Sequence, residues 1–288
     1  MRRWGVLSGI GASAIWGGMY VVSKVVLDVI PPFTLLTLRL FLGSLVLGLI
    51  ICLRGGLGFD RQQWREVLGV GIVGYGISIG LQFVGTKLSS ASNGALITSS
   101  TPAFVLLFAA LLLKEKMSIR RALALALSTL GALIVVDPRN ARLAPDFFWG
   151  NLSLIGAALT WALYSVLIRL VTRRLDALRV SFVAFMGGLL LTVPVSFWEW
   201  KTIGFGEIDW GVVGGVLYLG VVSTALAMFL WNTAFAVLPA GVASLTLFVQ
   251  PLVGALLGSL GLGERLSALF YFGGALIGAG LILAVREG

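Results

Sequence analysis

Long apolar runs alternate with short polar or turn-forming stretches along the whole chain. A membrane-spanning helix needs roughly 20 mostly apolar residues, and ten of the runs approach or exceed this length. A bilayer admits only helices or closed barrels, and these runs are too long and too little alternating for barrel strands. The pattern therefore predicts an all-α integral membrane protein with ten transmembrane helices, over residues 4–27, 34–53, 66–87, 92–113, 120–136, 148–170, 177–198, 210–235, 240–262 and 266–285.

The apolar pattern is written twice. Residues 4–16 and 149–161 are identical at eight of thirteen aligned positions, and Trp16 pairs with Trp161 at an offset of 145 residues. Four pairs farther along align at an offset of 149 residues: Pro102 with Pro251, Glu115 with Glu264, Ser118 with Ser267, and Gly131 with Gly280. We interpret this as two five-helix repeats, over residues 1–140 and 146–288. Because five is odd, the second copy is expected to be inverted in the membrane, a plan shared by many secondary transporters.

Composition and charge agree with a bilayer as the solvent. Hydrophobic residues make up 58% of the 288 residues, the mean hydropathy is +1.02, and charged residues make up 11%, against about 25% in soluble domains. The net charge of +9 does not indicate nucleic acid, because the basic residues cluster in short loops. With both termini in the cytoplasm, the inner side holds fourteen of them: Arg2, Arg3, Arg54, Arg61, Arg65, Lys114, Lys116, Arg120, Arg121, Arg169, Arg173, Arg174, Arg179 and Arg286. The outer side holds six, so the positive-inside rule favours this orientation.

The motifs that the sequence lacks narrow the function. There is no Gly-x4-Gly-Lys-Ser/Thr motif for ATP, and no Cys/His cluster or HExxH for a metal. The chain has no His and one cysteine, Cys52. We therefore expect no enzyme activity, no cofactor, no metal, no ATP and no nucleic-acid partner. We expect the protein to be a monomer. Its expected partners are membrane lipid and a small-molecule substrate.

Polar and aromatic residues gather at positions that fall near the middle of the predicted spans, at a rise of 1.5 Å per residue. Tryptophan prefers membrane interfaces, so Trp16 and Trp161 at mid-depth require either a cavity or a partner for the N–H group. One interpretation is an aromatic wall of a substrate cavity, and the other is helix packing with the N–H bonded to a neighbouring helix. The candidate substrate-binding residues are Trp16, Tyr20, Tyr75, Ser78, Ser99, Trp161, Tyr164, Asn232 and Gln250.

Five further residues are candidates for gating or structural roles. Pro102 and Pro251 are expected to kink spans 4 and 9, which needs no ligand. Arg39 is the one basic residue inside a predicted span; it is either functional or snorkels to the outer surface. Glu115 and Glu264 end spans 4 and 9 beside basic residues and are expected to fix the hairpins to spans 5 and 10.

These motifs together resemble the drug/metabolite transporter superfamily, specifically its EamA-type ten-helix members. The resemblance covers nearly the whole chain and rests on Trp16 and Trp161, the 91–102 segment ending in Pro102, Gln250-Pro251, and the hairpins around Glu115 and Glu264. It implies a multi-pass carrier of the bacterial inner membrane with both termini cytoplasmic. It also implies a central cavity surrounded by helices 1, 3, 4, 6, 8 and 9. The aromatic amino-acid exporters are the most similar members.

The sequence thus predicts a secondary transporter that exports small metabolites, foremost neutral or aromatic amino acids, by alternating access. All twelve acidic residues lie in loops or at span ends, so the chain lacks the mid-membrane carboxylates that are typical of proton coupling. This favours a facilitator that runs down the substrate gradient. One alternative is a proton-coupled exporter of drugs or sugar-linked metabolites. An alternative of another class is a non-transporting membrane subunit or an intramembrane enzyme.

Overall fold

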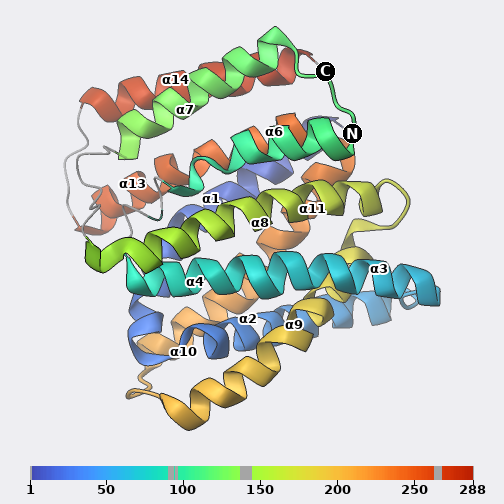
Figure 1. Ribbon diagram of the computed structural model, residues 1–288, viewed down its shortest axis with the longest axis vertical. Helices are drawn as coiled ribbons and strands as arrows, with labels where there is room; N and C mark the ends of the chain where they lie inside the picture. Colours follow the sequence, from blue (N-terminus) through green and yellow to red (C-terminus); the bar gives the residue numbers. More distant parts are fainter. Residues whose placement is uncertain (1, 90–93, 95–96, 137–144, 263–267, 288) are drawn as a thin grey trace.

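The computed structural model describes residues 2–89, 94, 97–136, 145–262 and 268–287, and this part of the chain contains helices and their connections but no strand (Figure 1). The elements in chain order are α1 (Arg2–Val29), α2 (Pro32–Leu53), α3 (Arg61–Gly71), the π-helix η1 (Ile72–Ser78), α4 (Ile79–Leu88), α6 (Thr101–Leu112), α7 (Ile119–Val136), the 3-10 turn η3 (Pro145–Phe147), α8 (Phe148–Thr172), α9 (Ala177–Thr202), α10 (Trp210–Leu217), the π-helix η4 (Tyr218–Leu226), α11 (Ala227–Val237), α12 (Ala240–Leu245), the 3-10 turn η5 (Thr246–Phe248), α13 (Val249–Leu262) and α14 (Ala268–Glu287).

The predicted all-α membrane fold is confirmed. Nine helical segments within the described residues are long and apolar enough to cross a bilayer, and α6 is a shorter apolar helix in the place of span 4. The boundaries differ from the predicted ones mostly by a few residues. The end of α9 is one such difference: the helix continues to Thr202, so Glu199 lies inside a helix, where the sequence indicated a loop.

The helices run roughly side by side, and both ends of the chain lie at the same end of the bundle (Figure 1). Each of the four most extensive helix pairs joins one helix from the first half with one from the second: α7 with α14, α2 with α9, α1 with α11, and α4 with α8. The two halves are therefore interleaved, and the space between them is the natural place for a shared site.

Glycine allows the closest of these pairs, α7 and α14, to approach at their backbones. A Cβ atom at Gly131 would lie 2.5 Å from the carbonyl oxygen of Gly273, and one at Gly273 would lie 2.7 Å from the carbonyl oxygen of Gly131. Small residues at such crossings replace side-chain packing with backbone contact, which is a common way for membrane helices to associate.

Irregular helix geometry occurs at corresponding places in the two halves. A π-helix interrupts the third span as η1 and the eighth span as η4. The helix is also broken just before each predicted proline kink. A turn at residues 99–100 precedes Pro102, and η5 precedes Pro251. Proline explains both breaks, because it lacks the N–H group and its ring clashes with the preceding turn.

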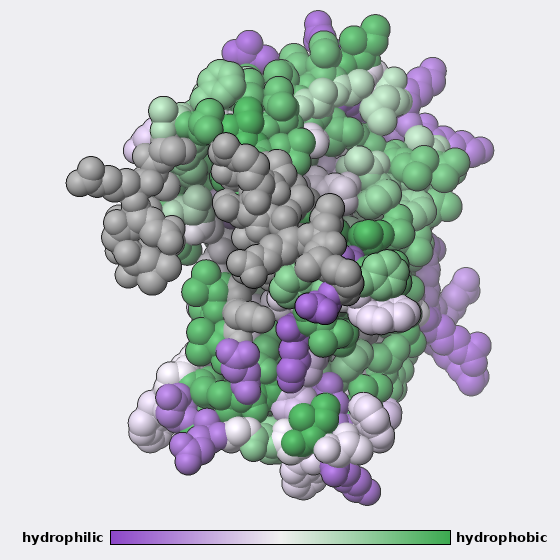
Figure 2. All heavy atoms as spheres, turned by 60° about the vertical axis from the view of Figure 1, so that its left-hand side comes forward, coloured by the Kyte–Doolittle hydropathy of each residue, from purple (hydrophilic) through white to green (hydrophobic). Residues whose placement is uncertain are grey.

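Much of the outer surface is apolar. Large side chains such as Leu49 and Trp149 are 64% and 69% exposed. Figure 2 shows hydrophobic residues across much of one face, with hydrophilic residues at its edges and in its lower middle. A soluble protein does not leave this much apolar surface in water, and the chain is a multi-pass membrane protein.

Candidate functional site

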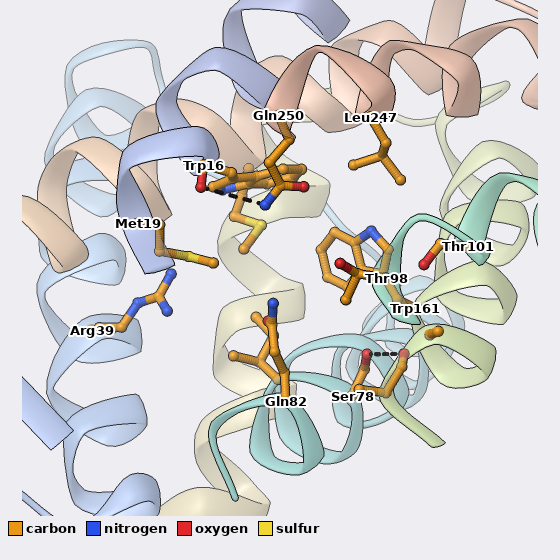
Figure 3. A pocket seen from close by; sticks show the side chains of 14 residues that line it. Trp16, Met19, Arg39, Ser78, Gln82, Thr98, Thr101, Trp161, Leu247 and Gln250 are labelled. Atoms are coloured by element: carbon orange, nitrogen blue, oxygen red, sulfur yellow. Dashed lines mark hydrogen bonds between the residues drawn. The ribbon is translucent and has the colours of Figure 1, made fainter. Parts of the chain in front are cut away.

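A cavity lies between the two halves of the chain, with a volume of about 50 Å³ open to the centres of water-sized molecules (Figure 3). The wall is mostly apolar and combines residues from both halves: Trp16, Met19, Arg39, Ser78, Ile79, Gln82, Thr98, Thr101, Ala157, Ala158, Trp161, Met228, Leu247 and Gln250. The broken start of α6 and the η5–α13 junction both contribute to it. Both helix breaks therefore lie at the cavity wall.

Trp16 and Trp161 face each other across this wall. Their ring centroids are 5.7 Å apart and the planes meet at 81°, an edge-to-face contact. The indole N–H of Trp16 donates to the backbone carbonyl of Ser223 in η4, at 3.0 Å. Trp16 thus lines a cavity, and its N–H is also bonded to a neighbouring helix, as the packing interpretation expects.

A third tryptophan, Trp231 of α11, completes an aromatic cluster that sequence reasoning did not assemble. Its ring centroid lies 5.3 Å from that of Trp16 and 6.1 Å from that of Trp161. Trp231 is fully buried and packs against both of these rings. The sequence does contain a signal for it, since Trp231 directly precedes Asn232, a candidate substrate-binding residue.

Gln250 lies on the wall at the start of α13. Its side-chain Nε2 donates to the backbone carbonyl of Trp16 at 3.4 Å. The approach of α13 to α1 depends on Gly17, where a Cβ atom would lie 2.9 Å from the backbone oxygen of Gln250. The amide group is therefore held beside Trp16 on the cavity wall (Figure 3).

The small hydroxyl residues divide between the wall and the bundle. Ser78 is on the wall, and its hydroxyl donates to the carbonyl of Ala157 at 2.9 Å, which joins η1 to α8. At the start of α6, Thr98 and Thr101 contribute side chains to the wall, whereas Ser99 does not. The break before Pro102 turns the neighbouring hydroxyls of this segment to different sides.

Three predicted substrate-binding residues form a closed network behind the wall, and the structure does not bring them to the cavity. Tyr75, Tyr164 and Asn232 are all fully buried, and the two tyrosine hydroxyls bond to each other. The Tyr164 hydroxyl donates to Asn232 Oδ1 at 2.7 Å. Asn232 Nδ2 donates to the Tyr75 hydroxyl at 3.2 Å and to Ser181 Oγ at 2.8 Å. The Tyr164 ring lies 4.8 Å from the Trp161 ring, so the network supports the wall.

Arg39 lies on the cavity wall with none of its side chain exposed, which excludes snorkelling to the outer surface. Its Nε donates to Thr224 Oγ1 at 2.9 Å and its Nη2 donates to Ser223 Oγ at 3.4 Å. The guanidinium carbon lies 5.0 Å from the ring centroid of Phe83. Among the described residues, Nη1 has no hydrogen-bond partner and no carboxylate lies within 4.0 Å.

Glu115 joins the two halves at one end of the bundle. Its carboxylate accepts from Arg169 Nε and from the backbone N–H of Ala240, each at 3.1 Å, and pairs with Arg121 at 3.6 Å. Arg169 also donates to the carbonyl of Phe235 at 2.7 Å. The expected tie to span 5 exists through Arg121, but the shorter contacts of Glu115 reach α8 and α12 of the second half.

Two candidates cannot be placed on the wall. Tyr20 belongs to α1, but its side chain lies outside the described residues. Glu264 also lies outside them. Pro251 directly follows Gln250 in α13, and Pro102 is buried near the start of α6.

Comparison with known proteins agrees with this architecture. The model of the EamA-like transporter family matches the chain twice, over residues 3–137 and 148–286. The uncharacterized transporter YoaV of Bacillus subtilis is 25% identical over 285 residues, covering 96% of this chain and 95% of the relative. An uncharacterized transporter of Archaeoglobus fulgidus is 22% identical over 290 residues, covering both chains fully.

A protein of known crystal structure has the same fold. It superposes with a TM-score of 0.80 at 21% sequence identity, covering 100% of this chain and 98% of the other. The helical fold of this chain is therefore one that a solved structure also has.

Proposed function

Because the chain belongs to the EamA-like transporter family, we propose that it exports small amphipathic metabolites, foremost neutral or aromatic amino acids, from the cytoplasm by alternating access. The observation that carries this proposal is the cavity between the two halves, walled by Trp16 and Trp161. Secondary transporters place substrates at such a repeat interface. The proposed location is the bacterial inner membrane, with both termini in the cytoplasm.

The chemistry of the wall supports an amphipathic substrate. Rings of Trp16 and Trp161 give an apolar or aromatic side chain a surface for stacking. Gln250, Thr98 and Thr101 supply neutral donors and acceptors on the same wall. A few placed polar groups in an apolar cavity are what a small-molecule site needs for orientation.

The Glu115 cluster supports alternating access. It holds α6 and α7 of the first half against α8 and α12 of the second at a single end of the bundle. In the proposed cycle these contacts close the cytoplasmic end, and they break when the cavity opens to that side.

Transport is proposed to be facilitated and to use neither ATP nor a cofactor, with the monomer as the working unit. The described residues that line the cavity include no carboxylate, and a buried carboxylate is the usual relay for a coupled proton. The proposed driving force is the outward gradient of the substrate.

The test is uptake of radiolabelled phenylalanine, leucine and threonine into proteoliposomes. Saturable flux is expected for at least one of them in the wild type, with a loss of about tenfold or more in Trp161→Ala and in Gln250→Ala. Trp149→Ala is the matched control, because Trp149 lies on the same helix as Trp161 but is 69% exposed. Absence of saturable flux for all three amino acids contradicts the proposed substrate class. A proton flux that tracks substrate flux contradicts facilitation.

A further inference from the structure

Arg39 is the one charged side chain on the described wall of the cavity. It is fully buried, and the described residues offer it no carboxylate within 4.0 Å. An ionised group without a counterion is strongly unfavourable inside a membrane protein, more so than two neutral hydroxyls repay. A cation retained in this state is a sign that the compensating anion comes from outside the chain.

The contacts of Arg39 fix its guanidinium and leave one edge free. Thr224 Oγ1 accepts from Nε, while the Thr224 hydroxyl donates to the carbonyl of Leu219 at 2.7 Å. Ser223 Oγ accepts from Nη2. The remaining nitrogen, Nη1, is buried and has no partner in the part of the chain that the structure describes. Figure 3 shows the guanidinium extending from α2 toward the cavity, beside Met19.

The π-helix η4 sets the position of this cation relative to the aromatic wall. Ser223 accepts from Trp16 through its backbone carbonyl and from Arg39 through its side chain. One helical segment thus holds both the cation and the aromatic ring in place. π-helical segments recur at functional sites, because the extra residue redirects side chains and carbonyls.

From these contacts we infer that the Nη1 edge of Arg39 binds the carboxylate of the substrate, so that the transported molecules are carboxylates with an apolar or aromatic tail. This inference rests on the proposed function and names the group that the site recognises. A charge-assisted hydrogen bond from guanidinium to carboxylate would supply the missing counterion. A phosphate carries up to two charges, whereas the described wall offers a single cation, so a monoanion fits better. The tail would lie against Trp16 and Trp161.

The wall of described residues offers no carboxylate for an ammonium group. The inference therefore predicts that the acid group, and not the amine, is the required part of the ligand. A simple aromatic acid without an amine, 3-phenylpropionate, is expected to bind, and its neutral analogue of the same size, 3-phenylpropan-1-ol, is expected to bind at least about tenfold more weakly.

The experiment is equilibrium binding of radiolabelled 3-phenylpropionate to the purified full chain, with the unlabelled acid and the alcohol as competitors. Arg39→Gln should remove the preference for the acid, and Arg39→Lys should keep part of it, because the charge remains without the Nη1 edge. Arg54→Gln is the matched control, since it removes the same charge just beyond the end of the same helix, at an exposed position. It should keep the full preference.

Equal competition by acid and alcohol in the wild type overturns the inference without any variant, so an unfolded Arg39→Gln protein does not protect it. An unchanged preference in a folded Arg39→Gln protein also overturns it, and leaves Arg39 as a tie between α2 and η4. Amino-acid flux that does not depend on Arg39 would leave the proposed function standing while the inference fails. Binding that prefers the acid, in a protein that shows no amino-acid flux, would support the inference while the proposed function fails.

Discussion

Two groups of polar side chains lie fully buried between the halves of the bundle, and they differ in how their hydrogen-bonding capacity is used. In the tyrosine–asparagine network, both polar atoms of Asn232 are occupied by Tyr75, Tyr164 and Ser181. At Arg39, two nitrogens are hydrogen-bonded, and the described residues offer the third no partner. The first group uses all of its N–H and O–H donors internally, while the second has a charge and an unused donor.

The difference teaches that burial of a polar residue in a membrane helix does not mark a substrate site by itself. Neutral groups that satisfy one another stabilise helix contacts, and their removal leaves buried donors or acceptors unpaired. A charge without a counterion does the opposite, because its burial opposes folding. The closed network is therefore expected to govern stability, and the open cation is expected to govern binding.

The largest expected effect on stability is at a third cluster, in which Glu115 forms ion pairs with Arg169 and Arg121. Glu115→Gln removes the counterion of Arg169, whose side chain is 12% exposed, and should lower stability by about 3 kcal/mol. Thermal unfolding in detergent measures this loss. Glu66→Gln is the control, because its partner Arg174 is 61% exposed, and it should change stability by less than about 1 kcal/mol. Equal losses of stability in the two variants would show that the buried Glu115–Arg169 pair stabilises the fold no more than the exposed Glu66–Arg174 pair.

The closed network is tested by Asn232→Leu. It leaves the hydroxyls of Tyr75 and Tyr164 without the amide, and stability should fall by about 2 kcal/mol. Thr233→Val is the neighbouring control, since the Thr233 hydroxyl bonds to Phe229 of its own helix and should cost less than about 1 kcal/mol. A folded Asn232→Leu protein should still prefer 3-phenylpropionate to the alcohol. Loss of that preference would place the network in the binding site after all.

The smallest effect on stability is expected at Arg39. Arg39→Gln removes a buried charge along with two hydrogen bonds to hydroxyls, so the two changes offset each other within about 1 kcal/mol. Apparent Tm should stay close to that of the wild type while the preference for the acid disappears. A large drop in Tm would indicate that Arg39 acts chiefly as a tie between helices.

Much of this architecture could be predicted from the sequence. The ten apolar runs and the paired prolines define the spans and their breaks, because helix length and proline chemistry are local properties. Trp16 and Trp161 are predicted from their depth and their pairing in the repeat, and Gln250 from its depth and its place before Pro251; all three lie on the wall. Depth follows directly from position along a helix, so this part of the site was accessible to sequence reasoning.

The direction in which a side chain points could not be predicted from the sequence. Tyr75 and Ser78 both lie in η1, yet Ser78 reaches the wall while Tyr75 lies in the network behind it. The extra residue of a π-helix shifts every later side chain by about 100° around the axis, so α-helical periodicity fails there. For Arg39, no local pattern indicates Ser223 and Thr224 as neighbours, since they are more than 180 residues away along the chain.

The most direct measurement compares the preference for 3-phenylpropionate over 3-phenylpropan-1-ol in wild type, Arg39→Gln and Asn232→Leu, each verified as folded. The account predicts a preference of about tenfold or more in the wild type and in Asn232→Leu, and none in Arg39→Gln. The account would be contradicted by a preference that survives in Arg39→Gln and is lost in Asn232→Leu. The closed network would then be the site, and the open cation a structural tie.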